Sequence, residues 1–262
     1  MLLRSVSTFA IVAGLLSMSV GAQAAEPPEA SRFGVASRER FAEAPAPVGL
    51  IDFCRRQPQQ CRTPGQSEIA LERDVAEARQ TYWRQVFASR GVASSGPSAI
   101  DRRAPRRSTR SSGQIETLDL GIAAEARIAV GGSQWALVET INRDINRSIL
   151  QTDDQRQYAV SDYWNVPVAR PGSRARGDCE DFVLAKRAAL IARGVPGEAL
   201  SIALVTTPWN EPHAVLLVAS DRGDFVLDNL DERIFHWSRA DLTWRSRQRP
   251  GDILKWIDLG GV

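Results

Sequence analysis

The residues best suited to chemistry lie in three short segments of the second half of the chain. Cys179 stands in Gly-Asp-Cys-Glu-Asp (177–181), His213 in Pro-His-Ala, and Asp228 in Leu-Asp-Asn. A thiol becomes a nucleophile when a neighbouring imidazole takes its proton, and a third group must orient that imidazole. The three residues therefore predict nucleophilic catalysis by a Cys-His-Asp triad. The structural alternative for Cys179 is a buried core cysteine, which its flanking charges disfavour.

The segment 178–193 is expected to be the helix that carries the thiol. Nearly every position after its first turn is apolar, which is typical of a helix buried in a core. Asp178 is placed to cap the N-terminus, Asp181 completes a spacing like that of a capping box, and Gly194 ends the helix. Cys179 then occupies the first helical position.

The rest of the second half predicts strands packed against this helix. Hydrophobic periodicity indicates helices at 68–88 and 134–149. Strands are expected at 200–205, 214–219 and 224–230, with edge strands at 242–244 and 253–257. Together these elements predict an α+β fold, in which a central helix with Cys179 at its N-terminus packs on an antiparallel sheet.

The turn at 220–223 predicts how the histidine and the aspartate meet. If all four residues form the loop of a hairpin, Val215 lies opposite Asp228. His213 is then one step away on the same face, at about 7 Å along the diagonal. A slip of one residue would place the two side chains on opposite faces. Asp228 is preferred as the third member because, unlike nearby aspartates, it lies in an apolar strand context. The second histidine, His236, is expected to be structural.

The N-terminus predicts export. Residues 1–24 have the form of a signal peptide, with Arg4, an apolar stretch at 9–20 and the small residues Ala22 and Ala24 at the positions that a signal peptidase reads. An uncleaved membrane anchor is the alternative, which the short apolar stretch disfavours. The mature protein is expected to be soluble and periplasmic.

The remaining chain is expected to divide into a lead and a catalytic domain. Residues 25–47 are rich in Pro, Ala, Glu and Arg and are expected to be disordered. Residues 48–133 form a helical lead that contains a basic linker at about 89–113, and residues 134–262 form the domain that carries the triad. The linker is either a solvated insertion or a docking segment for an acidic partner or an anionic membrane.

The three cysteines of the chain have different expected roles. Cys54 and Cys61 lie close together in a polar segment, and in an oxidising compartment such a pair predicts a short-loop disulfide. A metal site there is disfavoured because the chain has only 2 histidines. Cys179 is left unpaired, as a reactive thiol would be. The formal net charge of +2 is too small to predict nucleic-acid binding.

The acidic residues beside Cys179 create an electrostatic conflict. A helix N-terminus and a nearby imidazolium lower the pKa of a thiol, whereas Asp178, Glu180 and Asp181 raise it. A divalent cation bound by these carboxylates would remove the conflict, and Ca²⁺ accepts such ligands at irregular geometry. The alternative is that the carboxylates only stabilise the helix N-terminus.

The motifs taken together resemble one family, the bacterial transglutaminase-like cysteine peptidases, including the LapG-like periplasmic proteases. The residues that carry the resemblance are Phe53-Cys54…Cys61, Val138-Glu139-Thr140-Ile141-Asn142, Ile145-Asn146, Asp162-Tyr163-Trp164, Gly177-Asp-Cys-Glu-Asp-Phe, Lys186, Pro212-His213-Ala214-Val215-Leu216 and Leu227-Asp228-Asn229-Leu230. The resemblance implies a papain-like transglutaminase core, the triad Cys179, His213 and Asp228, and calcium dependence through Asp178, Glu180 and Asp181.

LapG-like members clip a large surface adhesin near its N-terminus, which releases the adhesin and disperses the biofilm. An inner-membrane cyclic-di-GMP receptor holds these proteases when that messenger is abundant. The resemblance implies these partners here. Two segments depart from the pattern, the insert at about 89–113 and residues 207–212 before His213. Trp164 is expected either to line the cleft or to pack in the core. The alternatives to a peptidase are an acyl-transferring transglutaminase and a catalytically silent, calcium-dependent binding module.

Overall fold

The computed structural model of the protein describes residues 41–90 and 119–262. The predicted signal peptide and most of the segments 25–47 and 89–113 lie outside the described residues, so those predictions stay predictions. Within the described residues, no helix combines the length and the apolar character needed to cross a membrane.

The described residues form helices and strands in mixed order. The helices are α1 (Val48–Arg56), α2 (Pro58–Cys61), α3 (Glu68–Ser89), α4 (Ser133–Ser148), α5 (Asp154–Tyr158) and α6 (Cys179–Ala192), with 3₁₀ turns η1 (Gly197–Ala199) and η2 (Trp237–Arg239). The strands are β1 (Glu43–Ala44), β2 (Ile149–Gln151), β3 (Ala175–Gly177), β4 (Leu200–Thr206), β5 (Pro212–Ser220), β6 (Gly223–Leu227), β7 (Phe235–His236), β8 (Thr243–Arg249) and β9 (Asp252–Asp258).

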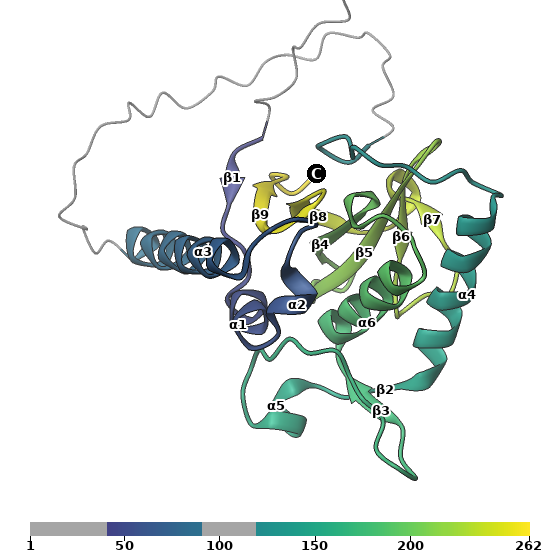
Figure 1. Ribbon diagram of the computed structural model, residues 1–262, viewed down its shortest axis with the longest axis horizontal. Helices are drawn as coiled ribbons and strands as arrows, with labels where there is room; N and C mark the ends of the chain where they lie inside the picture. Colours follow the sequence, from purple (N-terminus) through teal and green to yellow (C-terminus); the bar gives the residue numbers. More distant parts are fainter. Residues whose placement is uncertain (1–40, 91–118) are drawn as a thin grey trace, which may run out of the picture. The chain divides into compact units, whose positions relative to one another are not determined.

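In this part of the chain, seven strands form one antiparallel sheet in the order β1-β9-β8-β4-β5-β6-β7. The helix α6 packs on β5, with α4 beside it (Figure 1). The strands β2 and β3 form a separate parallel pair next to α6. The predicted α+β fold, with the Cys179 helix packed on an antiparallel sheet, is therefore confirmed.

Two sequence predictions about the edges of the sheet are wrong. The strands β8 and β9 were both expected at an edge, but β8 lies between β9 and β4, β9 lies between β1 and β8, and the edges are β1 and β7. Arg247 and Gln248 of β8 are buried: Arg247 binds Asp224 of the more distant strand β6, and Gln248 accepts a hydrogen bond from the Ile202 N–H of the neighbouring strand β4. Residues 41–47 were expected to be disordered, yet Glu43 and Ala44 pair with β9 as the strand β1.

The sheet is buried on both faces. Alternate residues of β5 enter two different clusters: Leu216 packs on the α6 side with Leu184, and Val215 packs on the other side with Trp244. Phe53 of α1 belongs to the same cluster as Leu184, so the helical lead shares the core of the sheet and α6.

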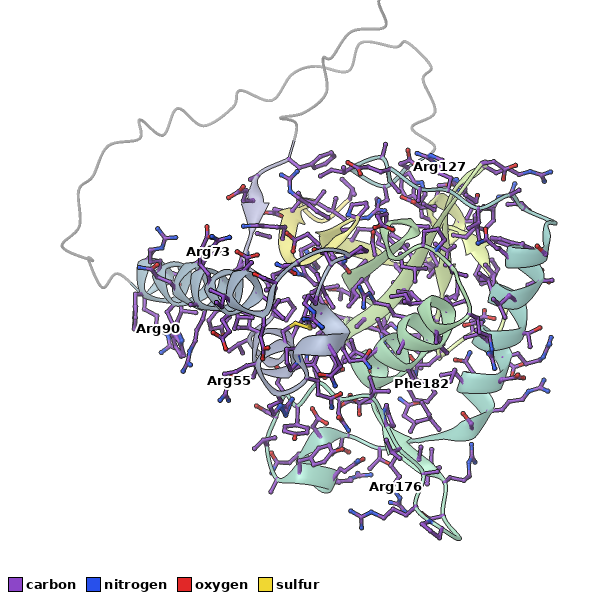
Figure 2. The ribbon with its side chains drawn as sticks, in the orientation of Figure 1. Arg55, Arg73, Arg90, Arg127, Arg176 and Phe182 are labelled. Carbon is purple, nitrogen blue, oxygen red and sulfur yellow. A yellow bond between two sulfur atoms is a disulfide. The ribbon has the colours of Figure 1, made fainter. Side chains whose placement is uncertain are left out.

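The predicted disulfide between Cys54 and Cys61 is present, with 5.5 Å between the two Cα atoms. It joins α1 to α2 inside the core and is visible as the yellow bond in Figure 2. Phe182, which Figure 2 labels on α6, packs against Ile149 of β2 and Ala175 of β3.

The β5–β6 hairpin has the predicted register but a shorter loop. Ser220 pairs with Gly223, so two residues rather than four form the loop. The ladder continues to the pair Leu216–Leu227. One more step in the same register places Val215 opposite Asp228, as the sequence predicts. The expected loop at 220–223 and the observed loop at 221–222 have the same midpoint, so both give the same pairing of residues.

Candidate active site

The imidazole and the carboxylate of the predicted triad are in contact. His213 Nε2 lies 2.7 Å from Asp228 Oδ1, and the two side chains are 5% and 12% exposed. The same carboxylate oxygen accepts a hydrogen bond from the Leu230 backbone N–H at 2.9 Å, and Asn146 of α4 binds the Asp228 carbonyl at 2.8 Å. Because Nε2 is engaged with Asp228, Nδ1 is the nitrogen that remains for a thiol.

The thiol of Cys179 lies at the first position of α6, beside β5. The backbone N–H of Ala214, the residue after His213, is directed at its sulfur. The thiol itself donates to Glu180 Oε2, with 3.0 Å between sulfur and oxygen. The structure therefore brings Cys179 next to the His213 segment, while its proton is directed at Glu180 rather than at the imidazole.

The electrostatic conflict expected at Cys179 is present. Burial raises the pKa of the thiol well above its usual value, and the negative charge and hydrogen bond of Glu180 raise it further, with a smaller contribution from Asp178. The Ala214 N–H acts in the opposite direction. In this arrangement the thiol keeps its proton, so activation requires the charge of the neighbouring carboxylates to be offset.

Three carboxylates form a cluster beside the thiol. Asp154, Asp178 and Glu180 each offer an oxygen, and these oxygens lie within 4.8 Å of one another. Burial is the main cause that raises the pKa of all three, to about 6 for Asp154 and about 7 for Asp178. Asp154 Oδ1 and Asp178 Oδ1 are buried without a hydrogen-bond partner. Unpaired buried carboxylate oxygens suit a hard cation such as Ca²⁺, so the residues present fit that ion.

Asp154 was missed by the sequence analysis. It opens the short helix α5, which Asp153 caps by accepting a hydrogen bond from the Arg156 N–H. The Thr152 N–H donates to the Gly177 carbonyl at 2.9 Å where β2 lies along β3, and this pairing brings Asp154 to Asp178. The Asp-Asp pair at 153–154 was a visible signal, but nothing local showed that it meets the Cys179 segment.

Asp181, by contrast, is not among the three carboxylates whose oxygens lie within 4.8 Å of one another, and its expected place among the metal ligands stays a prediction. Its Oδ1 accepts a hydrogen bond from the Asn165 N–H at 2.7 Å. Burial raises its pKa to about 9, and its Oδ2, like Asp154 Oδ1 and Asp178 Oδ1, is buried without a hydrogen-bond partner. A Cβ atom at Gly177 would lie 2.4 Å from Asp181 Oδ2, and only glycine allows this close approach. Asp181 therefore anchors the 162–165 segment to α6.

The structure decides two further expectations about this region. Asp178 is the N-cap residue of α6, but its side chain makes no capping hydrogen bond, because it turns toward Asp154 and Glu180 instead. Trp164 is 3% exposed and packs in the main core, where its Nε1–H donates to Asp162. It is a core residue rather than part of a cleft. His236 accepts a hydrogen bond from the Ser238 N–H, away from the triad, as a structural histidine would.

The family whose model matches the chain is that of the bacterial transglutaminase-like cysteine proteinases, over residues 118–262. This confirms the resemblance carried by the motifs. The matched region begins ahead of the boundary at 134 expected from the sequence. No curated protein matches the chain.

The solved structures that resemble this chain include three of LapG from Legionella pneumophila. The calcium-bound structure is 30% identical, over 43% of this chain and 64% of that chain, with a TM-score of 0.37. The EGTA-treated structure is 29% identical, over 43% of this chain and 61% of that chain, with a TM-score of 0.35. The third is 26% identical, over 44% and 65%, with a TM-score of 0.35. The chain thus matches less than two thirds of the length of these proteins.

The raised carboxyl pKa values predict that the metal-free protein loses stability as the pH rises. Unfolded, these carboxyls ionise near pH 4; folded, the pKa is about 6 for Asp154 and about 7 for Asp178. Between these values the folded state binds more protons than the unfolded state, so the free energy of unfolding falls with rising pH. Thermal unfolding in EGTA at about pH 5 and about pH 8 measures the fall, and calcium should reduce it. Equal melting temperatures at the two pH values in EGTA would contradict the raised pKa values of Asp154 and Asp178.

The cluster also predicts which carboxylate matters for a cation. Asp154→Asn should weaken calcium binding by about tenfold or more, since it removes one charged ligand of three. Asp181→Asn is the comparison variant, because Asp181 is not among the three carboxylates whose oxygens lie within 4.8 Å of one another, and it should bind calcium as the wild type does. Isothermal titration calorimetry with Ca²⁺ compares them. Equal affinities of the wild type and Asp154→Asn would remove Asp154 from the site.

Proposed function

Because the chain belongs to the bacterial transglutaminase-like cysteine proteinases, we propose that it is a calcium-dependent cysteine endopeptidase of the periplasm that clips a surface adhesin near its N-terminus and so controls biofilm attachment. The catalytic part of the proposal is supported by the 2.7 Å contact between His213 Nε2 and Asp228 Oδ1. The residue after His213, Ala214, directs its backbone N–H at the Cys179 sulfur. A cysteine peptidase needs these three groups in this order of contact.

In the proposed mechanism each triad residue has one task. His213 Nδ1 takes the thiol proton while Asp228 holds Nε2 and stabilises the imidazolium that forms. The Cys179 sulfur attacks the peptide carbonyl, and its backbone N–H at the helix N-terminus helps hold the oxyanion. The imidazolium then protonates the leaving amine, and water, deprotonated by His213, releases the acyl group from the sulfur.

Asp154, Asp178 and Glu180 are the residues that would hold calcium. Bound there, the ion would supply positive charge that offsets the carboxylates which raise the pKa of the Cys179 thiol. Glu180 then has two interactions: it belongs to the carboxylate cluster, and its Oε2 also accepts a hydrogen bond from the Cys179 thiol at 3.0 Å. Catalysis requires Glu180 to give up that bond, so that the thiol proton can pass to His213.

The substrate, partner and compartment are proposed from the resemblance of the sequence motifs to LapG-like members. On this basis the substrate is a large surface adhesin, and an inner-membrane cyclic-di-GMP receptor sequesters the enzyme. The disulfide of Cys54 and Cys61 supports an oxidising compartment, as the predicted signal peptide requires.

The mature protein, incubated with an N-terminal fragment of an adhesin from the same organism, should cleave it in calcium and not in EGTA. Cys179→Ala should abolish cleavage, a loss on the order of 10³-fold or more, because no other group replaces the nucleophile. His213→Ala should do the same, whereas His236→Ala should cleave normally, since His236 lies outside the triad. Gel analysis and mass spectrometry of the products measure the cleavage.

Each other outcome removes a defined part of the proposal. Cleavage in EGTA at the same rate would remove the calcium dependence and keep the peptidase. Cleavage by Cys179→Ala would remove the triad. If an added amine is incorporated into the product instead of water, the transglutaminase alternative replaces the peptidase. A folded protein whose thiol reacts with iodoacetamide no faster than a free thiol, and which cleaves nothing, would be a silent binding module.

A further inference from the structure

Helix α4 carries two asparagines that the proposed mechanism does not use. Asn142 and Asn146 lie four residues apart, so their side chains leave the same face of the helix. Asn142 is 0% exposed. Asparagine is a poorer helix former than alanine or leucine, and a buried amide loses its hydration. Two asparagines on one face of a helix therefore call for contacts that helix formation alone does not supply.

Both side-chain amides bind the segment 228–232, which follows β6 and begins with the triad carboxylate. Asn146 Nδ2 donates to the Asp228 carbonyl at 2.8 Å, and Asn142 Nδ2 donates to the Glu232 carbonyl at 3.0 Å. The two acceptors are the first and the last carbonyl of the segment. The helix α4 thus holds both ends of the segment by its main chain.

The imidazole and the carboxylate of the triad are held in different ways. His213 lies inside β5, where it pairs with Val205 of β4. The ladder between β5 and β6 ends at the pair Leu216–Leu227, and Asp228 is the first residue beyond it. The sheet therefore places the imidazole, whereas the Asp228 carbonyl is bound from α4.

The helix α4 is itself packed on the helix that carries the thiol. Val138 and Ile141 of α4 belong to the same buried cluster as Leu184 of α6, and the two helices lie side by side (Figure 1). Close-packed interiors transmit small displacements, so the position of α4 against α6 bears on the position of Asp228. The contact of Asn146 thereby relates the carboxylate to Cys179 as well as to His213.

We propose that Asn146 is a positioning residue of the triad, whose amide holds the Asp228 carbonyl and so keeps the Asp228 carboxylate directed at His213. Asp228 Oδ1 also accepts a hydrogen bond from the Leu230 N–H at 2.9 Å, so the turn of the segment and the direction of the carboxylate are coupled. If the segment shifts, the 2.7 Å contact lengthens, and the imidazole loses the group that orients it. This inference rests on the proposed peptidase function and assigns Asn146 a role within it.

The same helix offers two control positions. Arg147 binds the side chain of Glu232 at 3.0 Å and 3.1 Å, and these side chains are 64% and 49% exposed. Arg147→Met therefore removes a surface ion pair to the same segment and leaves its main-chain contacts in place. Ile141→Val shortens a core side chain of α4, which lowers stability while both amides remain. Both control variants should keep the wild-type kcat.

The first measurement is cleavage of the adhesin fragment in calcium by the wild type, Asn146→Ala, Asn146→Leu and the two controls, each with its melting temperature. Both Asn146 variants remove the donor to the Asp228 carbonyl, and Asn146→Leu keeps the volume of the side chain. Their kcat should fall by about tenfold while KM changes by less than about twofold, because the substrate still binds and only the imidazole is less well oriented. The assay temperature lies well below the lowest melting temperature, so every variant is folded.

The second measurement needs no substrate. Cys179→Ala removes the thiol, whose own titration would move the imidazole signals, and calcium and pH are held constant. His213 and His236 are the 2 histidines of the chain, so NMR can follow both rings. Asn146→Ala should shift the ring-nitrogen signals of His213, because the Asp228 carboxylate no longer meets its Nε2 in the same place. The signals of His236 should stay, and the two controls should move neither ring.

The outcomes separate this inference from the proposed function. A lower kcat at nearly constant KM in both Asn146 variants, with shifted His213 signals, supports the role of Asn146. An unchanged kcat, unchanged His213 signals, or an equal fall of kcat in Ile141→Val overturns it, because Asn146 would then act on stability alone. If the wild type cleaves nothing, the proposed function fails, and the NMR comparison still decides whether Asn146 positions the His213–Asp228 pair.

Discussion

The buried ion pair of Asp224 and Arg247 is the constraint on which the geometry of the site depends. Both side chains are at most 1% exposed, and Arg247 Nη1 lies 2.6 Å from Asp224 Oδ2. The sheet is apolar on both faces, so hydrophobic burial alone does not decide which face each residue of β6 takes. The ion pair does, because a slip of one residue would leave both charges buried and unpaired, at a cost of about 3–5 kcal/mol for an isolated charge. Asp228 follows Asp224 by four residues, so the contact with Arg247 also fixes how Asp228 meets His213.

The parts of the site that the sequence predicts are those set by local rules. The register of the β5–β6 hairpin follows from strand alternation and a short turn, and it places His213 and Asp228 on one face even though the loop is shorter than expected. The helix α6 is recognisable from its apolar run, and the disulfide from the short spacing of Cys54 and Cys61. Each of these features depends on residues that are close in the sequence.

The parts that the sequence does not predict depend on contacts between distant segments. Asp154 joins the carboxylate cluster only because β2 pairs with β3, and neither short strand has a strong periodic signal. The interior position of β8 is hidden by polar residues such as Arg247, whose partner Asp224 lies on another strand. In each case the sequence suggests that a charged residue is exposed to solvent. Its burial is explained only by a partner that is distant in the sequence, because an unpaired buried charge is costly.

The same distant contacts gather negative charge beside the Cys179 thiol. The carboxylates of Asp178 and Glu180 lie on one side of the thiol, where they raise its pKa and where a cation can offset them. An ion can be added or withdrawn, so in the proposed enzyme calcium controls whether the thiol can lose its proton to His213.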